Sequence, residues 1–241
     1  MKPWVSGPKE LLEHAIDHLP RGSAFDLRIA LISTDNAVEL AIKTFMGLPE
    51  RARGTPGPSR KELEQASQSF PDLLDLFEKQ ASDRIQGFEL GDIEWYHRLR
   101  NDLYHNGNGI TVDRDKVDGY LQIAKVLFES LFGEQVSRGA VPEHNSLGEF
   151  ILLWADLERD ARDLAVRILP KTKTLEHSLL RIVDGLVAKS RLTGQFRSRL
   201  EKVARVRNSV VHGLAKPDPA ELEVLTKELR DLTKELANAK E

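Results

Sequence analysis

Apolar residues recur at intervals of three and four along most of the chain, which is the spacing that gathers them on one side of an α-helix. No stretch alternates apolar and polar residues over the length of a strand, so we expect an all-α fold. The pattern predicts a short opening helix and eight longer ones, over residues 9–19, 24–47, from 60 to beyond 77 with an interruption at Pro71, 90–105, 113–132, 147–169, 174–189, 194–212 and 219–239.

The second half of the chain repeats the order of the first. The segment N-A-V-E-L-A-I-K at 36–43 aligns with D-A-R-D-L-A-V-R at 160–167, and a proline follows each one, Pro49 and Pro170. Because the match recurs in the same helix order, an internal repeat is the best explanation. Short connections favour antiparallel neighbours, so we expect two similar up-and-down four-helix bundles.

This interpretation gives a domain plan for the whole chain. Residues 1–20 form an N-terminal segment with a short helix, 21–135 a first helical domain, 136–146 a linker and 147–241 a second helical domain. The linker is rich in residues that break helices.

The last helix has leucines spaced by three and four residues. They are Leu222, Leu225, Leu229, Leu232 and Leu236. Such a seam is typical of a coiled coil and would make the chain a scaffold that forms a homodimer. Alternatively, the same leucines pack the fourth helix into the second bundle.

One polar motif occurs twice, each time near the end of a predicted helix. The first copy is R-L-R-N-D-L-Y-H-N-G at 98–107, and the second is R-V-R-N-S-V-V-H-G at 205–213. In each copy the Asn and the His are four residues apart and share a helix face, whereas the preceding Arg lies on the neighbouring face. An Arg, an Asn and a His at this spacing can contact one ligand beside the helix.

Composition narrows the classes of function. The net charge of −3 and the pI of about 6.2 argue against broad, non-specific binding of nucleic acid. The absence of cysteine excludes disulfides, thiol catalysis and cysteine-based zinc sites. No apolar run suits a membrane span or a signal peptide, so we expect a cytoplasmic protein without a membrane partner. No nucleotide-binding loop or metalloprotease signature is present, and we expect no cofactor and no metal.

Basic residues concentrate in 181–216. This segment contains nine Lys or Arg residues and only two acidic residues, Asp184 and Glu201. This is a candidate phosphate-binding surface, although a charge run on a helix is also typical of a solvated face. The arginines that we predict to bind RNA are Arg98, Arg205, Arg197 and Arg199.

The twin motif resembles the HEPN superfamily (higher eukaryotes and prokaryotes nucleotide-binding domains). R-N-D-L-Y-H and R-N-S-V-V-H both fit the family pattern R-x4-6-H, including the Asn that the family favours after the Arg. Many HEPN proteins are metal-independent ribonucleases of toxin-antitoxin, anti-phage and CRISPR systems. Two HEPN units pair about a pseudo-twofold axis so that both motifs face one cleft, and the resemblance implies such an intramolecular dimer here.

The resemblance also assigns roles to the motif residues. It implies an endoribonuclease that leaves a 2′,3′-cyclic phosphate on single-stranded RNA, with an antitoxin or defence protein as partner. The histidines would transfer protons, the arginines would bind phosphate oxygens and the asparagines would orient them. The catalytic candidates are Arg100, Asn101, His105, Arg207, Asn208 and His212, and the secondary candidates from the matched first helices are Glu39, Asp163, Asn36 and Asp160. His97 is a further secondary candidate, because it forms a stripe at four-residue intervals with Asn101 and His105; it either faces the same cleft or is a buried, hydrogen-bonded residue.

Two alternatives remain at this point. Some HEPN proteins are binding modules for a nucleotide, RNA or a protein, and an Arg and a His near a helix end can also serve structure alone. In one subgroup of HEPN toxins, a Tyr two residues after the His is nucleotidylated by the antitoxin. Here those positions are Gly107 and Leu214, which argues against that form of control.

Overall fold

The computed structural model describes residues 2–105, 111–136, 146–169, 178–211 and 218–239. It divides the chain into two compact units, Met1–Glu143 and His144–Glu241. The described residues form helices and turns, with no β-strand among them, which confirms the all-α class. Within this part of the chain, no helix is both long and apolar enough to cross a membrane.

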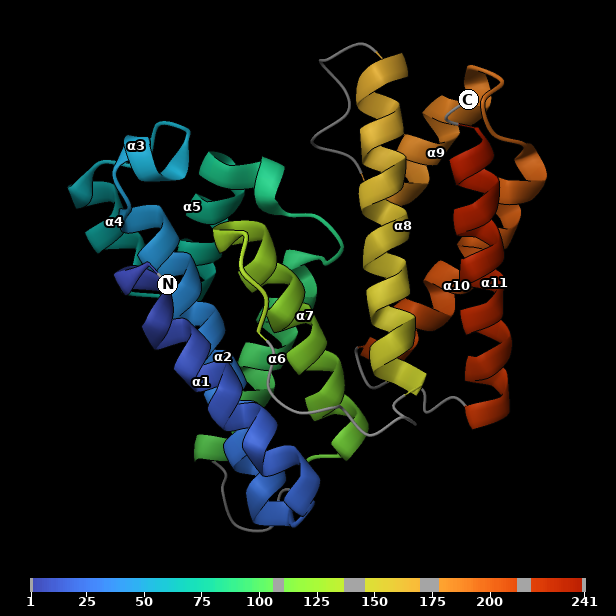
Figure 1. The fold of residues 1–241 in the computed structure, drawn as a ribbon. Coiled ribbons are helices and arrows are strands. Elements are labelled where there is room, and N and C mark those ends of the chain that lie inside the picture. Colours follow the sequence, from blue (N-terminus) through green and yellow to red (C-terminus); the bar gives the residue numbers. More distant parts are fainter. Residues whose placement is uncertain (1, 106–110, 137–145, 170–177, 212–217, 240–241) are drawn as a thin grey trace. The chain divides into compact units, whose positions relative to one another are not determined.

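The first unit is organised around one long central helix, α2 (Ala24–Gly47), which packs against α1, α5, α6 and α7 (Figure 1). Ser23 caps its start, since the Ser23 side chain accepts a hydrogen bond from the backbone N–H of Asp26. The other elements of the unit are η1 (Pro3–Val5), α1 (Ser6–His18), η2 (Leu19–Arg21), α3 (Glu50–Arg53), α4 (Arg60–Ala66), α5 (Phe70–Ala81), η3 (Ser82–Arg84), α6 (Leu90–His105) and α7 (Arg114–Phe132).

The region after α2 differs in detail from the sequence prediction. A short helix, α3, lies between the predicted helices over 24–47 and from 60, and the predicted interrupted helix is two separate helices, α4 and α5. The break falls at residues 67–69, because Ser69 caps α5 and Pro71 lies in its first turn, where a proline is tolerated. The opening helix α1 packs against α2 and α7.

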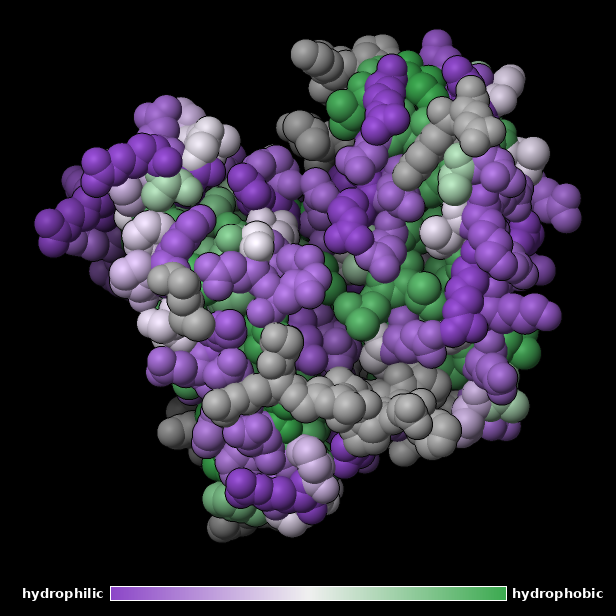
Figure 2. All heavy atoms as spheres, in the orientation of Figure 1, coloured by the Kyte–Doolittle hydropathy of each residue, from purple (hydrophilic) through white to green (hydrophobic). Residues whose placement is uncertain are grey.

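The second unit consists of α8 (Ser146–Ile168), α9 (Leu179–Ala188), α10 (Gly194–Val211) and α11 (Pro219–Asn238). Helix α8 packs against α9 and α11, and α10 packs against the same two helices (Figure 1). Each of the four helices therefore contacts two others, and together they surround one core. Figure 2 shows mainly hydrophilic residues on the visible surface of both units, as expected for helices whose apolar sides face inward.

The leucine seam of α11 belongs to the core of the second unit. Leu222, Leu229, Leu232 and Leu236 are buried, and their helix packs against α8 and α10. The structure thus favours the interpretation of α11 as a bundle helix, because a dimer through the seam would need these leucines at the surface.

This packing predicts a difference between two substitutions on α11. Leu229→Ala should lower the free energy of unfolding by about 2–5 kcal/mol, because Leu229 is fully buried and its removal leaves a cavity. Val224→Ala is the control, since Val224 is 67% exposed, and it should change stability by less than about 0.5 kcal/mol. Urea denaturation of the full chain, followed by circular dichroism, measures both. Equal effects would contradict the assignment of the seam to the core.

Candidate functional site

The side chain of Asp35, on α2, is the centre of a buried polar cluster in the first unit. It is fully buried and accepts three hydrogen bonds. His97 Nδ1 and Arg100 Nε, both from α6, lie 3.0 and 2.8 Å from Asp35 Oδ2. The hydroxyl of Tyr120, from α7, donates to Oδ1 at 2.8 Å. A buried carboxylate requires such partners, and these three connect α2 to α6 and α7.

Aromatic rings hold the donors in place. The imidazole of His97 stacks on Phe70, with ring centroids 3.9 Å apart and an interplanar angle of 17°. Tyr120 stacks on Tyr96 at 4.3 Å. Burial, and then the negative charge of Asp35, raise the pKa of the Tyr120 hydroxyl well above its ordinary value. The hydroxyl therefore stays protonated and remains a donor to Asp35.

Arg100 connects this buried cluster to the surface. Its Nε atom is bound to Asp35, whereas Nη1 donates to Asn101 Oδ1 at 2.9 Å and Nη2 to Asn36 Oδ1 at 3.1 Å. Glu39 Oε2 lies 3.7 Å from Nη2, and the Arg100 side chain is 19% exposed. Asn36 is exposed and Asn101 partly so. The outer edge of a fixed guanidinium thus lies beside two amide groups at the surface.

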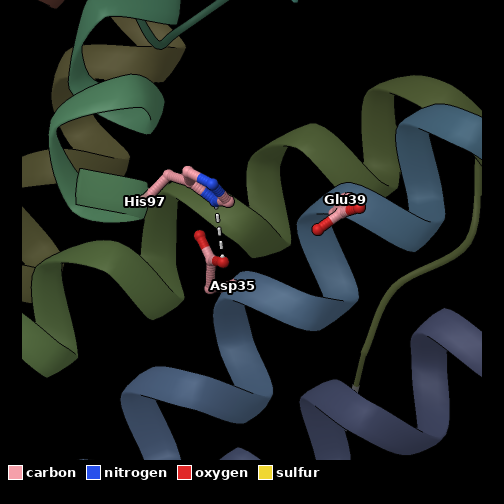
Figure 3. Close-up of side chains that lie close together, drawn as sticks. All are labelled: Asp35, Glu39 and His97. Carbon is pink, nitrogen blue, oxygen red and sulfur yellow. Dashed lines mark hydrogen bonds and ion pairs between the residues drawn. The ribbon is translucent and has the colours of Figure 1, made fainter. Parts of the chain in front are cut away.

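Asp35, Glu39 and His97 also place one possible metal-ligand atom each within 4.8 Å of one another (Figure 3). Arg100 makes this group a poor metal site. Its permanent positive charge binds Asp35 directly and lies near Glu39. A divalent cation would have to displace the guanidinium or share both carboxylates with it. The residues therefore fit a site whose positive charge comes from Arg100.

The second motif has different surroundings. Arg207, on α10, is fully buried; its Nη1 atom donates to Asn208 Oδ1 at 3.3 Å, and its guanidinium lies 5.9 Å from the ring centroid of Trp154 on α8. The repeat alignment places Arg159 opposite Asp35, and Arg159 is exposed and paired with Asp156. Arg100 and Arg207 therefore share a sequence motif but not an environment.

Other predicted site residues divide between the described and undescribed parts of the chain. Asn208 and Asp163 are exposed, and Asp160 is partly exposed. His105 is the last residue of α6, but its side chain lies outside the described residues, as does the whole of His212. The positions of the two histidines relative to the arginines thus remain predictions.

The four arginines that we predicted to bind RNA all pair with carboxylates. Arg197 contacts Asp184 and Glu201, and Arg199 contacts Glu228 and Glu235 of α11. These contacts balance much of the positive charge seen in the sequence and join α10 to α9 and α11.

Arg98 and Arg205 form pairs within their own helices, with Glu94 at 3.2 Å and Glu201 at 3.0 Å. Both guanidinium groups are exposed, and exposed pairs of this kind contribute at most about 1 kcal/mol. Arg98 and Arg205 can therefore exchange a carboxylate for a phosphate at little cost, unlike Arg197 and Arg199.

Sequence reasoning did not identify Asp35 or Tyr120. A signal for Asp35 exists, because it falls at the helical spacing of Leu31, Val38 and Ile42, which are all buried apolar residues of α2. An acid within an apolar stripe is rarely fully buried without a partner and so indicates a buried polar site. Tyr120 gives no such signal, since a tyrosine in an apolar stripe is ordinary.

Comparison of the chain with protein-family models, with curated proteins and with solved structures found no match in any of the three.

Proposed function

We propose that the chain is a HEPN-like, metal-independent endoribonuclease whose phosphate-binding group is Arg100. The observation that carries this proposal is the way in which Arg100 is held. The buried carboxylate of Asp35 accepts a hydrogen bond from Arg100 Nε. The Nη1 and Nη2 atoms of Arg100 lie beside the amides of Asn101 and Asn36 at the surface. A positive charge that is oriented before the substrate arrives stabilises a developing negative charge at little reorganisation cost.

The reaction that fits these residues uses the substrate as its own nucleophile. The 2′-hydroxyl of a ribose attacks the adjacent phosphorus, the bond to the 5′-oxygen breaks, and a 2′,3′-cyclic phosphate remains. A base must remove the proton of the 2′-hydroxyl, and an acid must protonate the leaving 5′-oxygen. Arg100 supports the proposal as the group for the phosphorane-like transition state, and the resemblance supplies His105 and His212 for the proton transfers.

A second candidate function is a non-catalytic HEPN-like module that binds a nucleotide, RNA or a protein. Two observations favour it. Arg207 is fully buried, and Arg197 and Arg199 are each held by two carboxylates. A ribonuclease that needed both motifs for phosphate binding would have to expose Arg207. The ribonuclease proposal therefore assigns phosphate binding to Arg100 alone.

RNA cleavage in excess EDTA separates the two functions. We expect the wild-type chain to cut a mixed-sequence single-stranded RNA, and His105→Ala to lower the rate about 10²–10⁴-fold through loss of a proton-transfer group. His105→Ala/His212→Ala should be inactive. An equal loss in His212→Ala alone would mean that both motifs act in one reaction. Activity that persists in the double variant, or that EDTA abolishes in the wild type, would contradict the proposal.

A further inference from the structure

His97 has the arrangement of a general base, although it lies outside the twin motif. It is one helical turn before Asn101 on α6, and it shares the Oδ2 atom of Asp35 with Arg100. The imidazole is thus bound to the same carboxylate oxygen as the guanidinium to which the ribonuclease proposal assigns the phosphate. The second unit has Ala204 at the corresponding motif position, so His97 is a feature of the first unit alone.

The contact with Asp35 determines which nitrogen of His97 carries the proton. A carboxylate only accepts hydrogen bonds, so the Nδ1 atom, 3.0 Å from Oδ2, must be the N–H donor. In the neutral ring the Nε2 atom is then the one with a free lone pair. Within the described part of the chain, Nε2 has no hydrogen-bond partner, and the side chain is 13% exposed.

The surroundings of His97 fix the ring without occupying Nε2. Phe70 stacks on one face of the imidazole, and Asp35, Glu39 and Arg100 lie close to it. Two carboxylates and one guanidinium leave an excess of one negative charge beside the imidazole. In many general bases, one imidazole nitrogen is hydrogen-bonded to a buried carboxylate and the other nitrogen is available to accept a proton. His97 has both features.

We propose that His97 Nε2 is the base that accepts the 2′-hydroxyl proton at the phosphate bound by Arg100. This inference rests on the proposed ribonuclease function and changes one assignment within it, because His97 replaces a motif histidine as the base and the motif histidines keep the role of the acid. The proton passes from the 2′-oxygen to Nε2 as the bond from that oxygen to phosphorus forms. The bond from phosphorus to the 5′-oxygen then breaks, and a motif histidine gives that oxygen its proton. The imidazolium of His97 returns its proton to water.

The test compares two variants of the full chain, one that replaces the Nδ1 group of His97 and one that replaces the Nε2 group. His97→Asn places an amide N–H where Nδ1 lies and so keeps a donor for Asp35, but it has nothing in place of Nε2. His97→Gln places its amide near Nε2 and loses the donor to Asp35. A merely structural His97 would therefore tolerate Asn better than Gln, whereas a base would be lost in both.

We expect His97→Asn to lower kcat/KM for RNA in EDTA about 10²–10⁴-fold while leaving the circular dichroism spectrum unchanged. The wild type and His97→Asn should also differ in the pH profile of kcat/KM, because the variant has no nitrogen in place of Nε2 that can accept the proton. Cleavage by His97→Asn at the wild-type rate, or with the wild-type pH profile, would overturn the inference and leave the ribonuclease function standing.

The tautomer of His97 can be measured without any cleavage. Long-range proton–nitrogen correlation spectra of the wild-type chain should show His97 protonated on Nδ1, and its ring signals should shift when uridine 3′-monophosphate is added. Protonation on Nε2 alone, or no shift with the nucleotide, would overturn the role of His97 whether or not the chain cuts RNA. A wild-type chain that cuts no RNA would instead overturn the proposed function, and the inference with it.

Discussion

Arg100→Lys is expected to lower kcat/KM for RNA cleavage about 10²–10³-fold, which is the usual cost of losing a preorganised donor to the transition state. Lysine keeps a positive charge for Asp35, so the buried carboxylate still has a partner. It loses the planar fork that contacts Asp35, Asn36 and Asn101 together. The catalytic loss should therefore be much larger than the loss of stability.

The matched control for this prediction is Arg98→Lys, two residues earlier on the same helix. Arg98 is exposed and pairs with Glu94 on its own helix. Its replacement should change kcat/KM less than tenfold, because an exposed basic group contributes mainly through long-range attraction, which either side chain provides. Steady-state cleavage of a fluorescent RNA by the wild type and both variants measures the difference. Equal losses in the two variants would show that Arg100 contributes only general positive charge.

Asp35→Asn is expected to lower the free energy of unfolding by about 3–5 kcal/mol. The exchange removes the negative charge that pairs with Arg100. It also turns part of a pure acceptor into an N–H₂ group that faces three donors, from His97, Arg100 and Tyr120. Buried donors that lose their acceptor pay the full cost of desolvation.

Asp75→Asn is the control for that measurement, because Asp75 is an exposed residue of α5 in the same unit. It should change stability by less than about 0.5 kcal/mol. Denaturant titration of the full chain, followed by tyrosine and tryptophan fluorescence, compares the two variants. A loss below about 1 kcal/mol in Asp35→Asn would mean that the cluster is not held by its charge, since neutral hydrogen bonds alone contribute about that much.

The apolar spacing was sufficient to predict most of the longer helices, because they bury one side and the spacing of their apolar residues follows from that burial. The start of α2 follows from the capping Ser23, and the end of α7 follows from Gly133, whose φ of 66° suits a glycine. The separation of α4 from α5 was harder to predict. A proline inside an apolar pattern can interrupt a helix or begin a new one, and here the capping Ser69 decides for a new helix.

The functional site could be predicted only in part. The repeated motif predicts the same catalytic role for Arg100 and Arg207, since each occupies the same position in its copy. It could not reveal that one guanidinium reaches the surface and the other is fully buried. That difference depends on residues of other helices, Asp35 for Arg100 and Trp154 for Arg207, which the motif does not contain.

Asp35 illustrates the same limit. Its partners His97, Arg100 and Tyr120 lie 62, 65 and 85 residues away along the chain, so no local pattern joins them. His97 was recognised only because it shares a helix face with Asn101 and His105. Its bond to Asp35, which gives it a chemical role, required the packing of α6 against α2.

The central claim is that Arg100 helps the 2′-hydroxyl of RNA attack its own phosphate without a metal. The most direct test offers the wild-type chain two single strands of one sequence in excess EDTA, one of RNA and one with every ribose 2′-O-methylated, and identifies the product ends by mass spectrometry. The account predicts that only the RNA is cut and that its products carry 2′,3′-cyclic phosphates. Cleavage of the methylated strand, or RNA products with 5′-phosphates, would contradict it.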